Sequence, residues 1–134
     1  MAIAETKRAL ERHLNGLTPT LPTAYEGVNF DPPTTIYQTV QFVIRKPDDP
    51  VLGTGYYRER LELQLFIVGE ANKGTAASIT RAELVRDRFK KGTTLTEGAF
   101  KIYILETPHV GSTAPVGNRT ITPVFIDVVT EVYS

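Results

Sequence analysis

Alternating apolar and polar residues in the middle of the chain predict two long, consecutive β-strands. In residues 36–45 and again in residues 56–68, every second side chain is apolar, with Gln38 and Glu59 as the polar exceptions. A period of two places such side chains on one face of a strand. Residues 46–55 between them are rich in proline, glycine and charge, which predicts a loop. The pattern therefore predicts a β-hairpin with strands longer than the usual length of about five to six residues.

Apolar residues at helical spacing mark two other segments. The first starts at the N-terminus and ends at Asn15-Gly16, two residues that tolerate the positive φ of a helix end. The second covers residues 75–91 and is ended by Gly92, with Arg81 outside its apolar stripe. Each helix is expected to bury that stripe. The stripes are Ile3, Leu10, Leu14 and Leu17 in the first helix and Ile79, Ala82, Val85 and Phe89 in the second.

Three further segments favour an extended conformation. Tyr25–Val28 has the residues of a short strand, and residues 100–106 alternate with every second side chain apolar. Residues 107–119 contain two prolines and two glycines and predict a long loop before a last strand over residues 120–133. Pro123 has no amide hydrogen, which favours an edge position or the start of strand pairing near it.

The order of these elements defines the expected fold class. Strands and helices are segregated and do not strictly alternate, which predicts an α+β protein. We expect a mainly antiparallel sheet with a long β-hairpin and two helices packed on one face. The 134 residues suffice for one core, so a single domain over residues 1–134 is expected.

Composition excludes several classes of function. Fifteen basic and fifteen acidic side chains cancel, and without a basic excess we expect no specific nucleic-acid binding. The absence of cysteine excludes disulfides, thiolate nucleophiles and cysteine-based zinc sites. Charge arrives at Glu5, so the N-terminus lacks the apolar core of a signal peptide, and no apolar run reaches membrane-spanning length. A soluble, cytosolic product without a membrane partner is expected.

Few residues offer catalytic or metal-binding chemistry. His13 in the first helix and His109 in the long loop have no partner nearby in sequence, so structural roles are expected for both. Asp48-Asp49 is the only adjacent pair of carboxylates. A turn in which aspartate caps its own backbone is the main interpretation, with a divalent cation as the alternative. The sequence therefore predicts no catalytic residue, no cofactor and no metal ligand.

A contact with another protein is the better candidate function for the hairpin. Aromatic and arginine side chains in residues 56–60 lie beside a polar strand face, as is typical of protein–protein contacts. A solvated outer face with ordinary cross-strand pairs is the alternative. The candidate contact residues are Arg45, Lys46, Asp48, Asp49, Tyr56, Tyr57, Arg58, Arg60 and His109.

Local patterns across most of the chain resemble a family of phage proteins. Residues 25–33, Tyr-Glu-Gly-Val-Asn-Phe-Asp-Pro-Pro, follow the first helix and precede the hairpin. The returning strand over residues 57–67, the helix ending near Phe89 and a closing segment over residues 122–128 complete the pattern. This arrangement is similar to the tail-terminator (tail-completion, neck) proteins of long-tailed bacteriophages, of the lambda minor tail protein U type. Tyr25 departs from the tryptophan more often expected there, which leaves the subgroup open.

The resemblance implies a structural virion protein of the tail and neck, assembled in the host cytoplasm. Such subunits form a closed ring, commonly a hexamer, that caps the last ring of tail-tube protein and stops polymerisation. The ring then presents a surface to the head-completion or connector protein of the filled head, and DNA can pass through its opening. A head-to-tail interface that closes would also cover the free strand edges that a long hairpin exposes.

Two alternatives stay open at this stage. A head–tail connector or tail-tube subunit would share the hairpin and helix but differ in the length of its polymer. A small α+β enzyme with its site between subunits would need a convergent acid–base set. A pocket lined by Arg81, Glu83 and His109 would indicate that enzyme.

Overall fold

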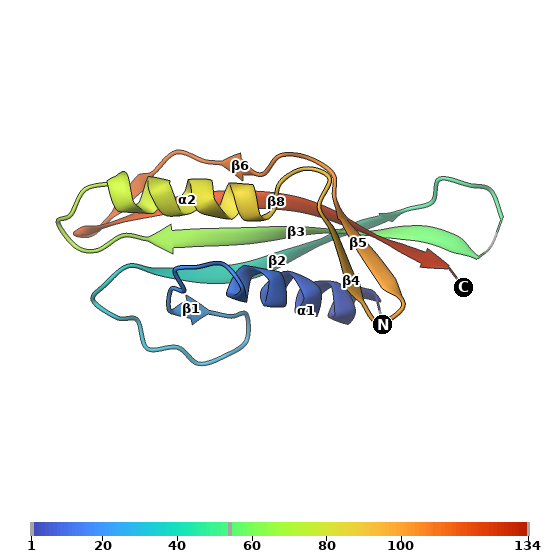
Figure 1. Cartoon of the computed structure of the whole chain (residues 1–134), viewed down its shortest axis with the longest axis horizontal. Coiled ribbons are helices and arrows are strands. Elements are labelled where there is room, and N and C mark those ends of the chain that lie inside the picture. The colour runs from blue at the N-terminus through green and yellow to red at the C-terminus, as the bar shows by residue number, and fades with distance from the viewer. Residues whose placement is uncertain (1, 54, 134) are drawn as a thin grey trace.

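The computed structural model describes residues 2–53 and 55–133; Met1, Ser134 and Thr54 of the expected hairpin loop lie outside the described residues. The helices and strands follow one another along an elongated molecule (Figure 1). They are α1 (Ala2–Asn15), β1 (Thr23–Ala24), β2 (Tyr37–Asp48), β3 (Tyr56–Val68), α2 (Ala76–Arg88), β4 (Thr94–Glu97), β5 (Phe100–Ile104), β6 (His109–Val110), β7 (Ala114–Val116) and β8 (Arg119–Tyr133).

One sheet contains all the strands of the described residues. Its order is β1-β2-β3-β8-β5-β4, with β6 and β7 also paired to β8. β8 is the central strand: it pairs with β3 over residues 121–133, and its other side pairs with β7, β6 and β5 in turn. Only β1 and β2 run parallel. The expected α+β class with a mainly antiparallel sheet and a long β2–β3 hairpin is confirmed.

Both helices pack on the same face of this sheet. Alternate side chains of β3 and β8 point toward the helices and meet the apolar stripes of α1 and α2. Burying such apolar area supplies most of the favourable free energy of folding. The core residues include Leu10 and Leu14 of α1, Ala82, Val85 and Phe89 of α2, Leu61, Leu63, Leu65 and Ile67 of β3, and Val124, Ile126 and Val128 of β8.

Three strands continue past the helices as a projecting arm. We define the arm as residues 44–53 of β2 and its turn, residues 56–58 of β3 and residues 131–133 of β8. It forms the right-hand end of the molecule in Figure 1. Ile44 lies on the face that the helices cover elsewhere, but it is 54% exposed, whereas its partner Leu61 on β3 is 1% exposed. In the arm, both faces of the sheet are therefore in contact with solvent.

The segment between β1 and β2 is tied to the sheet by polar side chains. The Glu26 carboxylate accepts hydrogen bonds from Lys7 Nζ (2.8 Å) and from the backbone N–H of Phe42 (3.0 Å). The Arg119 guanidinium donates to the backbone carbonyls of Pro33 (2.8 Å) and Thr35 (2.6 Å). Glu26 thus satisfies one outward-facing amide of β2, and Arg119 fixes the chain that follows the prolines.

The expected strand over Tyr25–Val28 is wrong. The extended segment is Thr23–Ala24, which pairs in parallel with β2. Residues 25–28 instead form a turn, in which the N–H of Val28 donates to the carbonyl of Tyr25 at 3.1 Å. Gly27 has φ of 78°, a conformation that ends a strand and that glycine adopts without steric cost.

The expected buried stripe of α2 is wrong at two positions. Ile79 is 40% exposed, whereas Arg81 is only 4% exposed. Arg81 tolerates burial because its guanidinium donates to Gln38 Oε1 at 3.3 Å and to the carbonyl of Pro19. Gln38, the polar exception in its strand, is buried for the same reason. The helix is therefore rotated toward a polar contact that its apolar spacing does not indicate.

Short strands occupy segments that were expected to be loops. β6 and β7 lie within residues 107–119, and β4 precedes β5, which ends at Ile104 and not at Glu106. Pro123 lies inside the central strand and not at an edge, whereas the alternative, a start of pairing near it, fits because β6 pairs with β8 from Val124 onward. The Pro123 carbonyl accepts the N–H of Gly111 at 2.8 Å, and the two polar groups of a strand residue point the same way. The missing N–H of Pro123 therefore faces the gap between β6 and β7, where pairing is already interrupted.

Candidate protein-contact surface

In the part of the chain that the structure describes, no helix covers the second face of the sheet. We call the side chains on this side of the strands the open face; they point away from α1 and α2. In β8, for example, Phe125 and Asp127 alternate with the core residues Val124 and Ile126. The open face comprises Tyr37, Thr39, Gln41, Val43 and Arg45 of β2, Arg58, Arg60, Glu62, Gln64 and Phe66 of β3, and Phe125, Asp127, Val129 and Glu131 of β8.

Charged side chains gather where the open face meets the arm. The Arg45 guanidinium contacts Glu62 (2.8 Å) and approaches Asp127 (4.0 Å). Arg58 lies 3.8 Å from Asp48, its partner on the neighbouring strand. Both signs of charge are therefore interspersed over three strands in a fixed register. Such an arrangement favours partners with the complementary pattern more than it adds stability.

The environments of two neighbouring carboxyl groups differ. Burial disfavours the charge of Glu62, but hydrogen bonds from Gln64 and Arg45 outweigh burial and lower the pKa of Glu62. Burial, and then the nearby Glu62 carboxylate, raises the pKa of Asp127 on the adjacent strand. The pair is thus a site where approach of a cationic group would be favourable.

Tyrosine side chains support this cluster from the end of the arm. Tyr56 donates its hydroxyl to Glu131 Oε1 (3.0 Å) and accepts a hydrogen bond from Arg58 Nε (3.0 Å). Its ring packs against Tyr133 with centroids 4.9 Å apart. Tyr57, the next residue, points to the opposite side of the strand and lies beside Val132. Of the two predicted tyrosines, only Tyr56 joins the charged cluster.

Other predicted contact residues lie apart from one another. Lys46 falls at an irregularity in β2, and Asp49 begins the turn of the arm; both are exposed. His109 lies in β6, where its ring stacks on Phe125 with centroids 5.9 Å apart. The structure therefore brings Arg45, Asp48, Tyr56, Arg58 and Arg60 to one end of the open face and His109 to another part of it.

The residues that would indicate an enzyme do not converge. Arg81 is buried between α2 and β2, Glu83 is exposed on α2, and His109 is exposed on the open face. Across residues 2–53 and 55–133, no group of three or more histidine or acidic side chains is arranged to hold a metal ion. In the same residues, no helix has the length and apolar character needed to cross a membrane.

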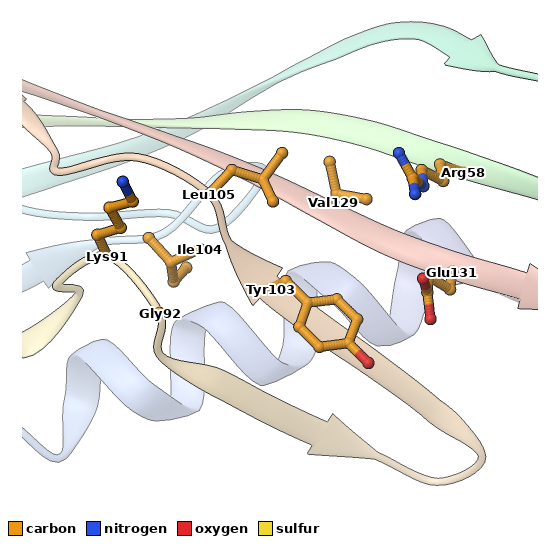
Figure 2. Close-up of a pocket in the computed structure, with 8 residues that line it drawn as sticks. All are labelled: Arg58, Lys91, Gly92, Tyr103, Ile104, Leu105, Val129 and Glu131. Carbon is orange, nitrogen blue, oxygen red and sulfur yellow. The ribbon is translucent and has the colours of Figure 1, made fainter. Parts of the chain in front are cut away.

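A groove on the open face was missed by sequence reasoning. Its volume is about 360 Å³, and its walls include the apolar parts of Tyr103, Leu105 and Val129. Figure 2 shows Lys91 at one end of the groove and Arg58 and Glu131 toward the other. A smaller hollow of about 70 Å³ shares Leu105 and Val129 with it. Four separate segments form the groove, so periodicity within any one of them gives no sign of it.

An open sheet face with ordered charges and a projecting arm are features of a subunit that assembles with other proteins. The comparisons agree with this class. The family model described as phage tail terminator protein matches residues 5–127. The chain belongs to the phage tail terminator protein family, which makes it a structural component of a phage tail. The match confirms the resemblance to this family, and the lambda minor tail protein U type stays a prediction.

The fold is also found in a solved protein structure. The two superimpose with a TM-score of 0.79, at 17% sequence identity, over 100% of this chain and 99% of the other. At that identity the likeness extends to the fold alone. A comparison with curated proteins finds no match.

Proposed function

We propose that this protein forms a closed ring, of about six subunits, that caps the phage tail tube. The ring ends polymerisation of the tube and provides the surface on which the head-completion or connector protein docks. It has no catalytic role, and it is assembled in the host cytoplasm before entering the virion. Its partners are other copies of the chain, the tail-tube protein and the head-completion protein.

The projecting arm is the observation that carries this proposal. In a monomer, the outer edge of β2 beyond Phe42 offers backbone groups that no described strand pairs. Exposed strand edges and apolar residues such as Ile44 are liabilities unless another chain covers them. A head-to-tail contact repeated around a closed ring leaves no free copy of that edge. The family supports a role in the tail, and the arm supports a role through self-assembly.

The open face supports a second contact, with the tube or the head. Basic and acidic side chains are interspersed on this face, and they are partly exposed. Such a surface suits a polar interface with a specific register. The two hollows add concave, partly apolar surface at the same place. A tail-tube or connector subunit would use similar surfaces but would give long polymers or a different ring.

Light scattering together with negative-stain images of the same fraction tests the proposal. We expect closed rings with a central hole and a molar mass of about six subunits. Purified rings added to polymerising tail-tube protein should shorten the tubes and appear at one end of each. Open-ended polymers of this chain alone would favour the tube-subunit alternative. A stable monomer that leaves tube length unchanged would overturn the capping function.

A further inference from the structure

We propose that the tip of the arm of one subunit inserts into the open-face groove of the next. The inserted residues are Val51 and Leu52, and they enter between Tyr103, Leu105 and Val129 of the second copy. This inference rests on the proposed ring and specifies the contact that holds neighbouring subunits together.

The tip presents two aliphatic side chains that its own subunit does not bury. Val51 is 51% exposed and Leu52 is fully exposed, at 104% of its reference area. Pro50 precedes them and Gly53, with φ of 108°, follows them, so the backbone turns sharply at this point. Single exposed apolar residues are common, but an adjacent pair at the end of a projecting arm is poised for burial in a partner.

One apolar wall of the groove is exposed in a similar way, whereas Val129 on its floor is only 6% exposed. Leu105 is 50% exposed on the groove wall, beside Val129 and the ring of Tyr103 (Figure 2). The volume of about 360 Å³ is at the scale of sites that enclose small ligands or anchor side chains. An aliphatic anchor that fills such a hollow is the usual energetic centre of an interface.

Charge on the two surfaces is complementary. Asp49 is exposed at the start of the tip, two residues before Val51. Lys91 is exposed at one end of the groove, immediately after the last turn of α2, and Lys90 is exposed beside it. Glu131 at the other end is already bound by the hydroxyl of Tyr56. The groove therefore has a basic end with which the acidic tip can pair.

A second copy of the chain is the occupant that these observations favour. The tip and the groove are different surfaces of one chain, so their contact is head-to-tail and repeats in one direction. Stable interfaces bury about 1,200–2,000 Å² in total, more than two side chains supply. The strands of the arm therefore have to lie along the neighbouring subunit as well, with the tip as the anchor.

The lack of cysteine makes a crosslinking test direct. Leu52→Cys and Leu105→Cys are made in separate chains, mixed, and joined by a short bismaleimide. We expect a crosslinked dimer in the mixture and none in either variant alone. A mixture of Leu52→Cys with Val116→Cys is the control, because Val116 is 55% exposed but lies in β7 at the other end of β8. The double variant Leu52→Cys/Leu105→Cys should give a ladder that stops at the ring size.

Sedimentation of Leu52→Asp gives a second readout, with Val116→Asp as its matched control. We expect Leu52→Asp to weaken self-association at least tenfold while Val116→Asp leaves it unchanged. Rings that form without the 52–105 crosslink would overturn this contact and leave the capping function intact. If the 52–105 crosslink forms but the subunits assemble into open chains, the result would support this contact and overturn the closed ring. A monomer without crosslinks at high concentration would overturn both.

Discussion

The two faces of β3 and β8 are built from alternating residues of the same strands, yet they follow different rules. The face under the helices is mainly apolar, with Glu59, Thr122 and Thr130 as its buried polar residues, and Leu63, Leu65 and Ile126 are at most 1% exposed. The open face carries arginine, glutamate and aspartate in paired positions on adjacent strands. We expect substitutions at exposed positions of the open face to leave the core packing unchanged. The comparison teaches that one face of the sheet specifies the fold, while the other is free to specify a partner.

The largest difference should appear between two adjacent residues of β3. Leu65→Ala should lower the free energy of unfolding by about 2–5 kcal/mol, because it removes a fully buried side chain and leaves a cavity. Gln64→Ala on the open face loses two side-chain hydrogen bonds and should cost less than about 1 kcal/mol. Urea denaturation measures both. Equal losses would contradict the division between the two faces.

A smaller loss is expected where the covered side holds a charge. Arg81→Met keeps much of the side-chain volume but leaves Gln38 and the carbonyl of Pro19 without their buried donor. We expect a loss of about 1–3 kcal/mol in urea denaturation. Arg86→Met, on a less buried part of the same helix, is the matched control and should change little. A neutral Arg81→Met would mean that apolar packing alone holds α2 in place.

The pH dependence of stability offers a further comparison of the two faces, because each face has one histidine near it. His13 is half-buried between the helices, where its Nε2 lies 2.7 Å from the carbonyl of Arg88, and burial lowers its pKa below 6.5. The folded state therefore binds fewer protons than the unfolded state. Its contribution to stability is complete above about pH 6.5 and is lost as pH falls toward the folded pKa. Stability should fall as the pH drops below about 6.5, and less so in His13→Gln.

His109→Gln on the open face is the control for that measurement. Its ring is exposed and stacks on Phe125 outside the core. The variant should keep the pH dependence of the unmodified protein in urea denaturation. If His109→Gln flattened the profile and His13→Gln did not, the assignment of the pH dependence to the helix contact would be wrong.

Charge reversal on the open face should have the smallest effect on stability and a clear effect on assembly. Arg58→Glu combined with Arg60→Glu removes one ion pair and places new negative charge near Glu131. We expect the free energy of unfolding to change by less than about 1 kcal/mol and the ring population in light scattering to fall. Lys73→Glu, exposed in the loop before α2, is the control for a charge reversal away from the open face. Unchanged assembly would exclude a role for these two arginines in the subunit contact.

The sequence predicted long periodic elements well and short ones poorly. The β2–β3 hairpin, both helices and β8 are confirmed because a period of two or of three to four is visible over more than ten residues. β6 and β7 contain two and three residues, too few to show any period, and they form because β8 offers them a partner. Pairing with β8 decided both strands, and for β7 this pairing is local, across the turn at residues 117–118.

The candidate contact residues show the same limit. Alternation placed Arg45, Arg58 and Arg60 on one strand face, and the structure brings them to one end of the open face. The groove could not be predicted, because Lys91, residues 103–105 and residues 129–131 meet only through the order of the sheet. Burial of Arg81 was missed for a similar reason: its acceptors lie in Pro19 and Gln38, far from it in the chain.

The central position of β8 has a consequence for synthesis. Ribosomes deliver residues 119–133 after β3, β5, β6 and β7 have been made, and those four strands meet one another only through β8. Until then, one edge of β3 in the hairpin is unpaired, and no strand joins β5, β6 and β7 to it. A chain cut short before residue 119 would therefore fail during its own folding, before it could enter a growing tail. The complete sheet can therefore form only after β8 has been translated.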